Sequence, residues 1–183
     1  MKKAILNIAV TALGALLFSC TKENDRNTYS EQDTLIEAFV NTRLSALDSA
    51  YAVVNKGSQR IVVKEGSGEP LATDGTVSFY YAGYILTRAD TLNAASMFAT
   101  NSIETAEAAG WELSGDTMDI LTLNLADTDI VEGLRNGLAG VKGGEECFIL
   151  FSGKHGFGKR QTGTIPAKSP LIYHIWVESI SNE

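Results

Sequence analysis

The chain has 183 residues, a formal net charge of −7 and two cysteines. An acidic chain of this kind lacks the basic surface that nucleic acid requires, so we expect no nucleic-acid partner. Two cysteines cannot form a disulfide framework, so the fold must depend on a hydrophobic core, for which the length suits one domain.

The N-terminal residues predict export and a lipid anchor. A basic start at residues 1–3 precedes an apolar run at 8–18, which is short of the roughly 20 residues that a permanent transmembrane helix needs. Residues 17–20 read Leu-Phe-Ser-Cys and resemble the lipobox of bacterial lipoproteins. We interpret residues 1–19 as a lipoprotein signal peptide, with an ordinary signal peptide as the alternative. Lipidation of Cys20 implies a membrane partner and the bacterial cell envelope, on the periplasmic or surface face of the outer membrane.

The next segment is polar and then helical in pattern. Residues 20–29 show no periodicity, which is typical of a flexible tether. Ser30 is placed as an N-cap with acidic Asp33 three positions later, and apolar residues follow at helical spacing. These features predict an N-terminal helical segment at 30–57, which ends at Gly57 as a C-cap.

From residue 58 onward the apolar pattern is that of strands, with one further helix. The helix has a stripe formed by Val131, Leu134 and Leu138, and Asp129 is its expected cap. Cys147 lies in an apolar run, so we expect it to be buried. The segment 101–119 shows no clear pattern. Strands are predicted at 60–63, 76–83, 120–125, 147–151 and 171–180.

Four blocks of this sequence, in this order, resemble the FKBP-type peptidyl-prolyl cis-trans isomerase family. The third and fourth blocks, at the family's spacing, are the most specific. The resemblance implies an α+β fold for residues 58–183, in which a curved antiparallel β-sheet wraps around a short α-helix. The blocks are Phe79-Tyr80-Tyr81-Ala82-Gly83, then Phe98-Ala99, then residues 130–145 from Ile130 to Glu145, and then residues 156–173 from Gly156 to Tyr173.

The resemblance also implies an activity and a site. Members of this family exchange the cis and trans forms of X-Pro bonds in an aromatic pocket, without a metal or other cofactor. Proline-containing polypeptides are therefore the expected partners. The backbone N–H of Val131 is the implied donor to the substrate. The implied catalytic residues are Tyr81, Phe98, Val131, Phe157 and Tyr173, and the implied substrate-binding residues are Leu121, Ile130, Leu134 and Ile165.

The chain departs from the family pattern at three positions. Ala99 stands where the family has an aspartate, Leu134 replaces a tryptophan at the floor of the pocket, and Phe157 replaces a tyrosine. These changes remove a carboxylate, an aromatic floor and a hydroxyl donor, so weak activity is expected.

Three functions are compatible with these residues. The first is an isomerase of exported proteins, and the second is a catalytically weak FKBP-like binding or chaperone lipoprotein. The third is a surface scaffold that acts through segment 101–119. The two histidines, His155 and His174, have no ligand-like neighbours in the sequence, so no metal site is predicted.

Overall fold

A computed structural model describes the backbone of residues 2–183 and the side chains from Glu23 onward. Cys20 and the predicted signal peptide at 1–19 lie outside the residues whose side chains are described, so lipidation stays a prediction. Within the described residues, no helix combines the length and hydropathy needed to cross a membrane.

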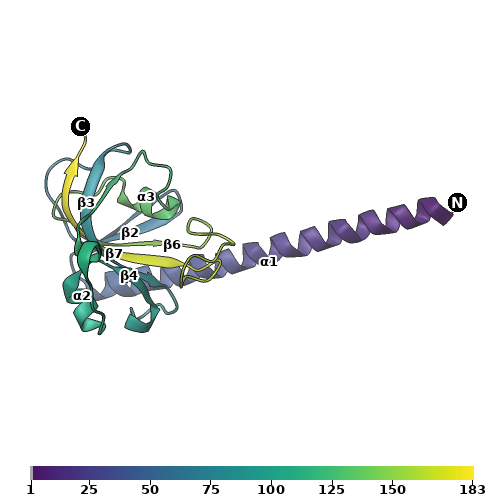
Figure 1. The fold of residues 1–183 in the computed structure, drawn as a ribbon, viewed down its shortest axis with the longest axis horizontal. Coiled ribbons are helices and arrows are strands. Elements are labelled where there is room, and N and C mark those ends of the chain that lie inside the picture. The colour runs from purple at the N-terminus through teal and green to yellow at the C-terminus, as the bar shows by residue number, and fades with distance from the viewer. Residues whose placement is uncertain (1) are drawn as a thin grey trace.

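The domain is built on one antiparallel sheet of seven strands in the order β1-β2-β6-β7-β3-β4, with β5 paired to β3 (Figure 1). β3 and β7 are long central neighbours, with Gly83 opposite Tyr173 and Tyr81 opposite Ile175. The strands are β1 Tyr51–Asn55, β2 Ser58–Lys64, β3 Thr76–Ile85, β4 Met97–Thr100, β5 Leu121–Asn124, β6 Glu146–Phe151 and β7 Leu171–Ser181.

Three α-helices accompany the sheet: α1 Lys2–Ala46, α2 Ile103–Ala108 and α3 Glu132–Leu138. α3 lies on one face of the sheet, and the C-terminal part of α1 runs along the other, while the rest of α1 leaves the domain (Figure 1). The predicted α+β fold, a curved antiparallel sheet around a short helix with an added N-terminal helix, is confirmed.

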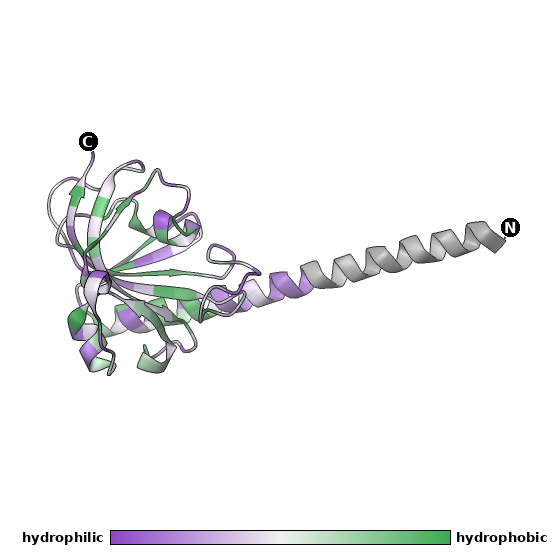
Figure 2. Cartoon of the chain, viewed as in Figure 1, coloured by the Kyte–Doolittle hydropathy of each residue, from purple (hydrophilic) through white to green (hydrophobic). Residues whose placement is uncertain are grey.

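Two hydrophobic clusters hold these layers together, one on each face of the sheet. Figure 2 shows hydrophobic residues recurring along the strands of the sheet. On the α3 face, alternate residues of β7 such as Leu171, Tyr173 and Ile175 are buried with Leu134 and Leu138 of α3. On the other face, the helix α1 buries its own apolar stripe against β2, β6 and β7. That stripe consists of Ile36, Phe39 and Val40.

Glycines allow α3 to approach the sheet closely. A Cβ on Gly133 would lie 2.2 Å from the ring of Phe151, and one on Gly137 would lie 2.2 Å from Ile149. The buried Ser58 hydroxyl donates to the carbonyl of Gly133 at 2.7 Å. Any larger residue at Gly133 or Gly137 would therefore push the helix off β6.

A buried arginine caps the other end of α3. The Arg60 guanidinium donates to the carbonyls of Gly137 and Ala139, both at 2.9 Å. Its Nε lies 3.3 Å from a carboxylate oxygen of Glu145, which is also buried. Burial outweighs this cation and raises the pKa of Glu145 above its usual value. The N–H donors of Arg60 satisfy the last carbonyls of the helix, and a positive charge is favourable at a helix C-terminus.

The structure corrects the predicted N-terminal segment. α1 ends at Ala46 rather than near Gly57, and residues 51–55 form β1. Lys56 and Gly57 both have positive φ, 44° and 85°, which is the geometry of a two-residue hairpin turn between β1 and β2. The β-branched residues of 51–55 pair with β2, so a strand replaces the last turns of the expected helix.

Residues 20–29, expected to form a flexible tether, belong to α1. Asp25 is paired with Lys159 and Lys168 of the loop between β6 and β7. Hydrogen bonds to these lysines, Lys159 first, lower the pKa of the Asp25 carboxyl. Because α1 already includes these residues, the helix does not begin at Ser30 as the capping pattern predicted.

The remaining expectations meet with mixed results. Cys147 is free and buried, as predicted. The unassigned segment 101–119 contains α2 and a short 3-10 helix at Gly115–Met118. The N-cap of α3 is Val131, with no side-chain cap, rather than Asp129. Glu132 instead approaches His155 Nδ1 at 3.2 Å.

Candidate active site

All of the side chains predicted for the pocket pack into the hydrophobic cluster between the sheet and α3. Tyr173 lies at the centre, 7% exposed, with its ring centroid 6.0 Å from that of Tyr81 and 5.6 Å from that of Phe98. Residues brought together from β3, β4, β5, β7, α3 and two loops are Tyr81, Phe98, Leu121, Ile130, Val131, Leu134, Phe157, Ile165 and Tyr173.

A glycine in β3 makes room for the second aromatic wall. A Cβ on Gly83 would lie 2.5 Å from the ring of Phe98. Gly83 is paired with Ala99 of β4 on one side and Tyr173 of β7 on the other. Phe98 therefore lies over the backbone of β3 and meets Tyr173 edge-on, with an interplanar angle of 80°.

The floor and rim come from α3 and the loops around it. Leu134 and Ile165 are 7% and 5% exposed, which makes them core residues as well as floor. Ile130, Val131 and Phe157 are only partly buried, so their outer surfaces remain available to a ligand.

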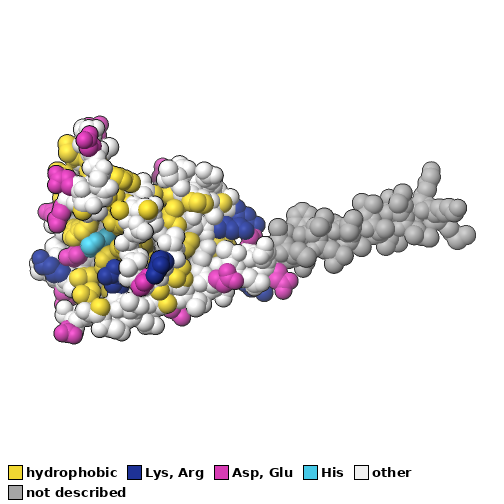
Figure 3. Space-filling view, turned by 90° about the horizontal axis from the view of Figure 1, so that it is seen from below, with side chains coloured by type: hydrophobic (Ala, Val, Ile, Leu, Met, Phe, Trp, Pro, Cys, Tyr) yellow, Lys and Arg dark blue, Asp and Glu magenta, His cyan; other side chains and the backbone are white. Residues whose placement is uncertain are grey.

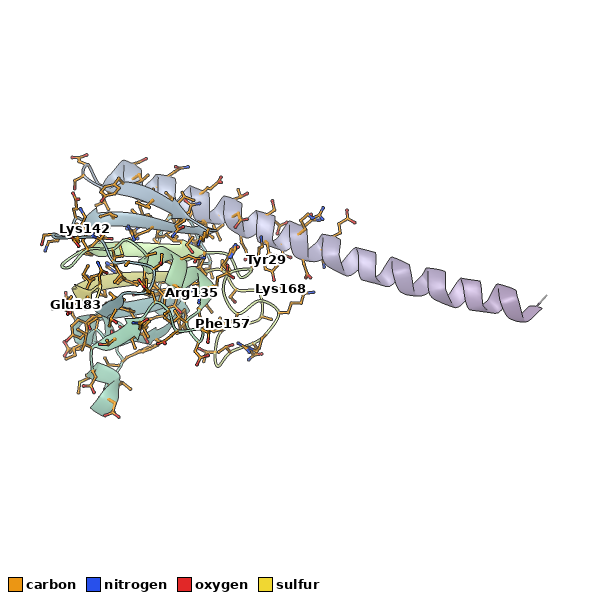
Figure 4. The ribbon with its side chains drawn as sticks, turned by 90° about the horizontal axis from the view of Figure 1, so that it is seen from above. Tyr29, Arg135, Lys142, Phe157, Lys168 and Glu183 are labelled. Atoms are coloured by element: carbon orange, nitrogen blue, oxygen red, sulfur yellow. The ribbon has the colours of Figure 1, made fainter. Side chains whose placement is uncertain are left out.

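Contacts with α1 position the loop that carries Phe157 (Figure 4). Gln32 accepts a hydrogen bond from the amide of Gly153 at 2.8 Å. The same side chain donates to the carbonyl of Lys168 at the other end of the loop. Figure 4 shows Lys168 beside the part of α1 that carries Tyr29. The N-terminal helix thus holds both ends of a loop that borders the site.

The site is apolar, with few polar groups. Burial raises the pKa of the Tyr173 hydroxyl far above its usual value and also raises the pKa of Tyr81. Both hydroxyls are therefore protonated donors at neutral pH. Within the described part of the chain, the amide of Val131 at the start of α3 makes no hydrogen bond. This amide is the group that the resemblance implies as a donor to the substrate.

Asn101 is a polar residue beside the site that the sequence reasoning missed. It is 5% exposed, and its Oδ1 accepts from the Tyr81 amide at 2.7 Å. Its amide nitrogen donates to the carbonyls of Asp119 at 3.0 Å and Phe79 at 3.4 Å. Asn101 therefore fixes the strand that carries Tyr81. An asparagine two places after Ala99 carries no distinctive spacing, so the sequence alone offered no signal for this role.

The position of the family's aspartate is occupied by Ala99, a partly exposed residue of β4. A neighbouring cavity of about 400 Å³ begins at Tyr81 and Leu121. The segment after β4 lines its other side with Trp111, Asp116 and other residues. Carboxylates thus border the site from this segment rather than from the β4 position.

No metal centre is formed by the residues that the structure describes, because no three His, Cys, Asp or Glu side chains converge there. The arrangement is an aromatic and aliphatic cluster with backbone and hydroxyl donors. Such a site can bind an apolar ring and hold a peptide carbonyl.

Comparisons with known proteins agree with this geometry. The sequence model for the FKBP-type peptidyl-prolyl cis-trans isomerases matches residues 69–178, more than half of the chain. "FK506-binding protein 1" of Aspergillus oryzae is 25% identical over 119 residues, which cover 65% of this chain and 94% of that protein.

Solved structures share the fold at low identity. A peptidyl-prolyl cis-trans isomerase from Pseudomonas syringae pv. tomato has a TM-score of 0.57 at 14% identity, covering 86% of this chain and 96% of that chain. FkpA from Escherichia coli has a TM-score of 0.54 at 17% identity, covering 96% of this chain and 71% of that chain.

Proposed function

This chain belongs to the FKBP-type peptidyl-prolyl cis-trans isomerase family, and from that we propose that it interconverts the cis and trans forms of X-Pro bonds in exported proteins, using its aromatic pocket. The observation that carries the proposal is the packing of Tyr81, Phe98 and Tyr173 against the loops of Val131 and Phe157. Binding of a proline ring in that cluster would bring its amide next to the donors described above.

The physical basis is desolvation of the prolyl amide. Rotation about a peptide bond faces a barrier of about 18–20 kcal/mol, because resonance gives the C–N bond partial double-bond character. The planar amide is more polar than the twisted one, so transfer into an apolar pocket disfavours the planar form. Each 1.36 kcal/mol gained in this way raises the rate about tenfold. No nucleophile or cofactor is required.

Three substitutions support a modest rate. Ala99 supplies no carboxylate to orient the substrate, and Phe157 supplies no hydroxyl. Leu134 makes a smaller floor than an aromatic ring would. The pocket stays apolar, so binding should be affected less than catalysis.

We also propose that the chain is anchored through a lipid on Cys20 and acts in the bacterial cell envelope. The basic start, the short apolar run and the Leu-Phe-Ser-Cys motif support this proposal. Mass spectrometry of the chain extracted from membranes would show the mass of the attached lipid on the peptide that begins at Cys20. An intact, unmodified N-terminus would rule the anchor out.

The activity is tested by measuring cis-trans exchange of X-Pro peptides with the full chain in nonionic detergent and without a coupled protease. We expect exchange above the uncatalysed rate, reduced at least tenfold by Phe98→Ala and Phe157→Ala together. Tyr51→Ala removes an aromatic ring that is 43% exposed on β1 and serves as the matched control. A folded chain that binds the peptides without accelerating exchange would refute the isomerase and leave a binding module.

A further inference from the structure

A second cavity lies on the opposite side of the sheet from the candidate active site. It has a volume of about 730 Å³ and runs between α2 and the outer face of β3, β6 and β7. Because side chains alternate along a strand, Tyr80 faces this cavity while Tyr81 faces the pocket. Its walls include Tyr80, Trp176, Ile103 and Met118. We call this cavity the outer groove.

A row of stacked side chains ends at the floor of the outer groove. The Arg43 guanidinium lies 5.4 Å from the ring centroid of Phe148. Phe148 stacks on His174 at 4.2 Å, and His174 lies 3.9 Å from Trp176. A cation therefore covers one end of the row, and the other end, Trp176, lines the outer groove.

The outer groove is acidic. Glu146, Glu178 and Glu104 line it, and neither lysine nor arginine is found among its described lining residues. Glu146 is bonded to His174 Nε2 at 2.8 Å, which fixes this carboxylate beside the aromatic row. Arg43, at the far end of the row, lies over the rings of Phe39 and Phe148. Lys64 of β2 is the register partner of Glu146 and is exposed, but it does not line the groove.

The rim of the outer groove is apolar and exposed. Ile103 is 52% exposed at the start of α2, and Met118, which also lines the groove, is 38% exposed. Figure 3 shows hydrophobic side chains gathered on this lower face of the domain, with both acidic and basic groups beside them. Exposed apolar side chains around a cavity are typical of an interaction site. The described carboxylates and histidine do not converge as metal ligands would, so the charge suits an organic cation.

We propose that the outer groove binds a segment of a partner polypeptide in which an arginine or lysine is flanked by apolar residues. The cationic group lies against Trp176 and Tyr80 and pairs with Glu146 and Glu178. The apolar neighbours contact Ile103. This site goes beyond the proposed isomerase function, because it recognises charge rather than proline and lies across the sheet from the pocket.

The test uses the full chain in nonionic detergent and a fluorescent, proline-free peptide of alternating leucine and arginine. Fluorescence anisotropy should show binding that weakens as salt is added. A peptide with citrulline in place of arginine keeps the shape and loses the charge, so it should bind at least about tenfold more weakly. Equal binding of the two peptides, or no binding of the arginine peptide, would overturn the proposal.

Variants locate the binding on the outer groove. Glu146→Gln with Glu178→Gln should weaken binding of the arginine peptide about tenfold, taking each of the two ion pairs, one half-buried and one exposed, as worth about threefold. The control, Glu31→Gln with Glu37→Gln, removes the same charge from exposed positions of α1 and should change affinity less than twofold.

A second variant leaves the hydrogen bond between Glu146 and His174 intact. Ile103→Ser alters only an exposed residue at the rim and should also weaken binding. A proline peptide that occupies the isomerase pocket should not displace the arginine peptide. Displacement, or equal effects of both charge pairs, would assign the binding to another surface and contradict the proposal.

Discussion

Removal of the Asn101 side chain tests the link between the sheet and the site. In Asn101→Ala the Tyr81 amide loses its acceptor at 2.7 Å, and the Asp119 carbonyl loses a donor at 3.0 Å. A buried polar group left without a partner costs about 1–3 kcal/mol. Asp119 is exposed and water can replace its donor, while the bond to Phe79 is long at 3.4 Å. We therefore expect a loss of about 1–3 kcal/mol in the free energy of unfolding, most of it from the Tyr81 amide.

Urea unfolding followed by tryptophan fluorescence measures this loss as a change in the midpoint at constant slope. Thr122→Ala is the matched control. It removes an exposed hydrogen bond of 2.8 Å between Thr122 of β5 and Ser78 of β3, the strand that also carries Tyr81. The control should cost less than about 0.5 kcal/mol, as exposed changes usually do. If Asn101→Ala is no more destabilising than Thr122→Ala, then Asn101 does not hold β3, and the reasoning is refuted.

Three further predictions concern packing, protonation and reactivity. Gly133→Ala should destabilise the fold by about 1–3 kcal/mol in thermal unfolding, because its Cβ would meet the ring of Phe151. Gly143→Ala, whose Cβ would make an ordinary contact at 3.9 Å with the Ser67 carbonyl oxygen, should change little, and equal effects would contradict this. Burial, partly offset by Glu146, lowers the pKa of His174. As the pH falls, the unfolded chain therefore takes up a proton on this imidazole before the folded chain does. Stability should then fall as the pH drops from about 6.5 toward the pKa of His174 in the folded chain. Urea midpoints measured across this pH range should show the loss, and it should be absent in His174→Gln. Burial raises the pKa of the Cys147 thiol, so in a Cys20→Ser chain, where Cys147 is the one remaining cysteine, Ellman's reagent should react only after unfolding; rapid native reaction would show that the Cys147 thiol is accessible.

The pocket residues could be predicted because their positions are tied to motifs of fixed spacing. Tyr81 and Tyr173 stand on long alternating strands, and the alternation determines which face they occupy. Leu134 belongs to the short helix whose apolar stripe is visible in the chain, and Val131 is the N-cap of that helix. The structure brings these residues into one cluster, although their roles in catalysis await the turnover measurement.

Other features escaped the sequence because they depend on distant partners. Helix α1 ends at Ala46 because residues 51–55 find a pairing strand in β2. Helix continues through residue 25 where Asp25 meets two lysines more than a hundred positions away. Local capping signals at Ser30 and Gly57 were overridden by these contacts, as tertiary context commonly does to weak local preferences.

The sequence by itself determined the family, the α+β class and the face of each long strand, because hydrophobic periodicity and motif spacing are local properties. Only the tertiary structure decided that Asn101 supports Tyr81, that α1 holds the loop of Phe157, and that an acidic groove opens behind the site. In each of these features, residues far apart in the sequence come together only when the chain folds. Their energies come from burial and hydrogen bonding between elements, which no single segment contains.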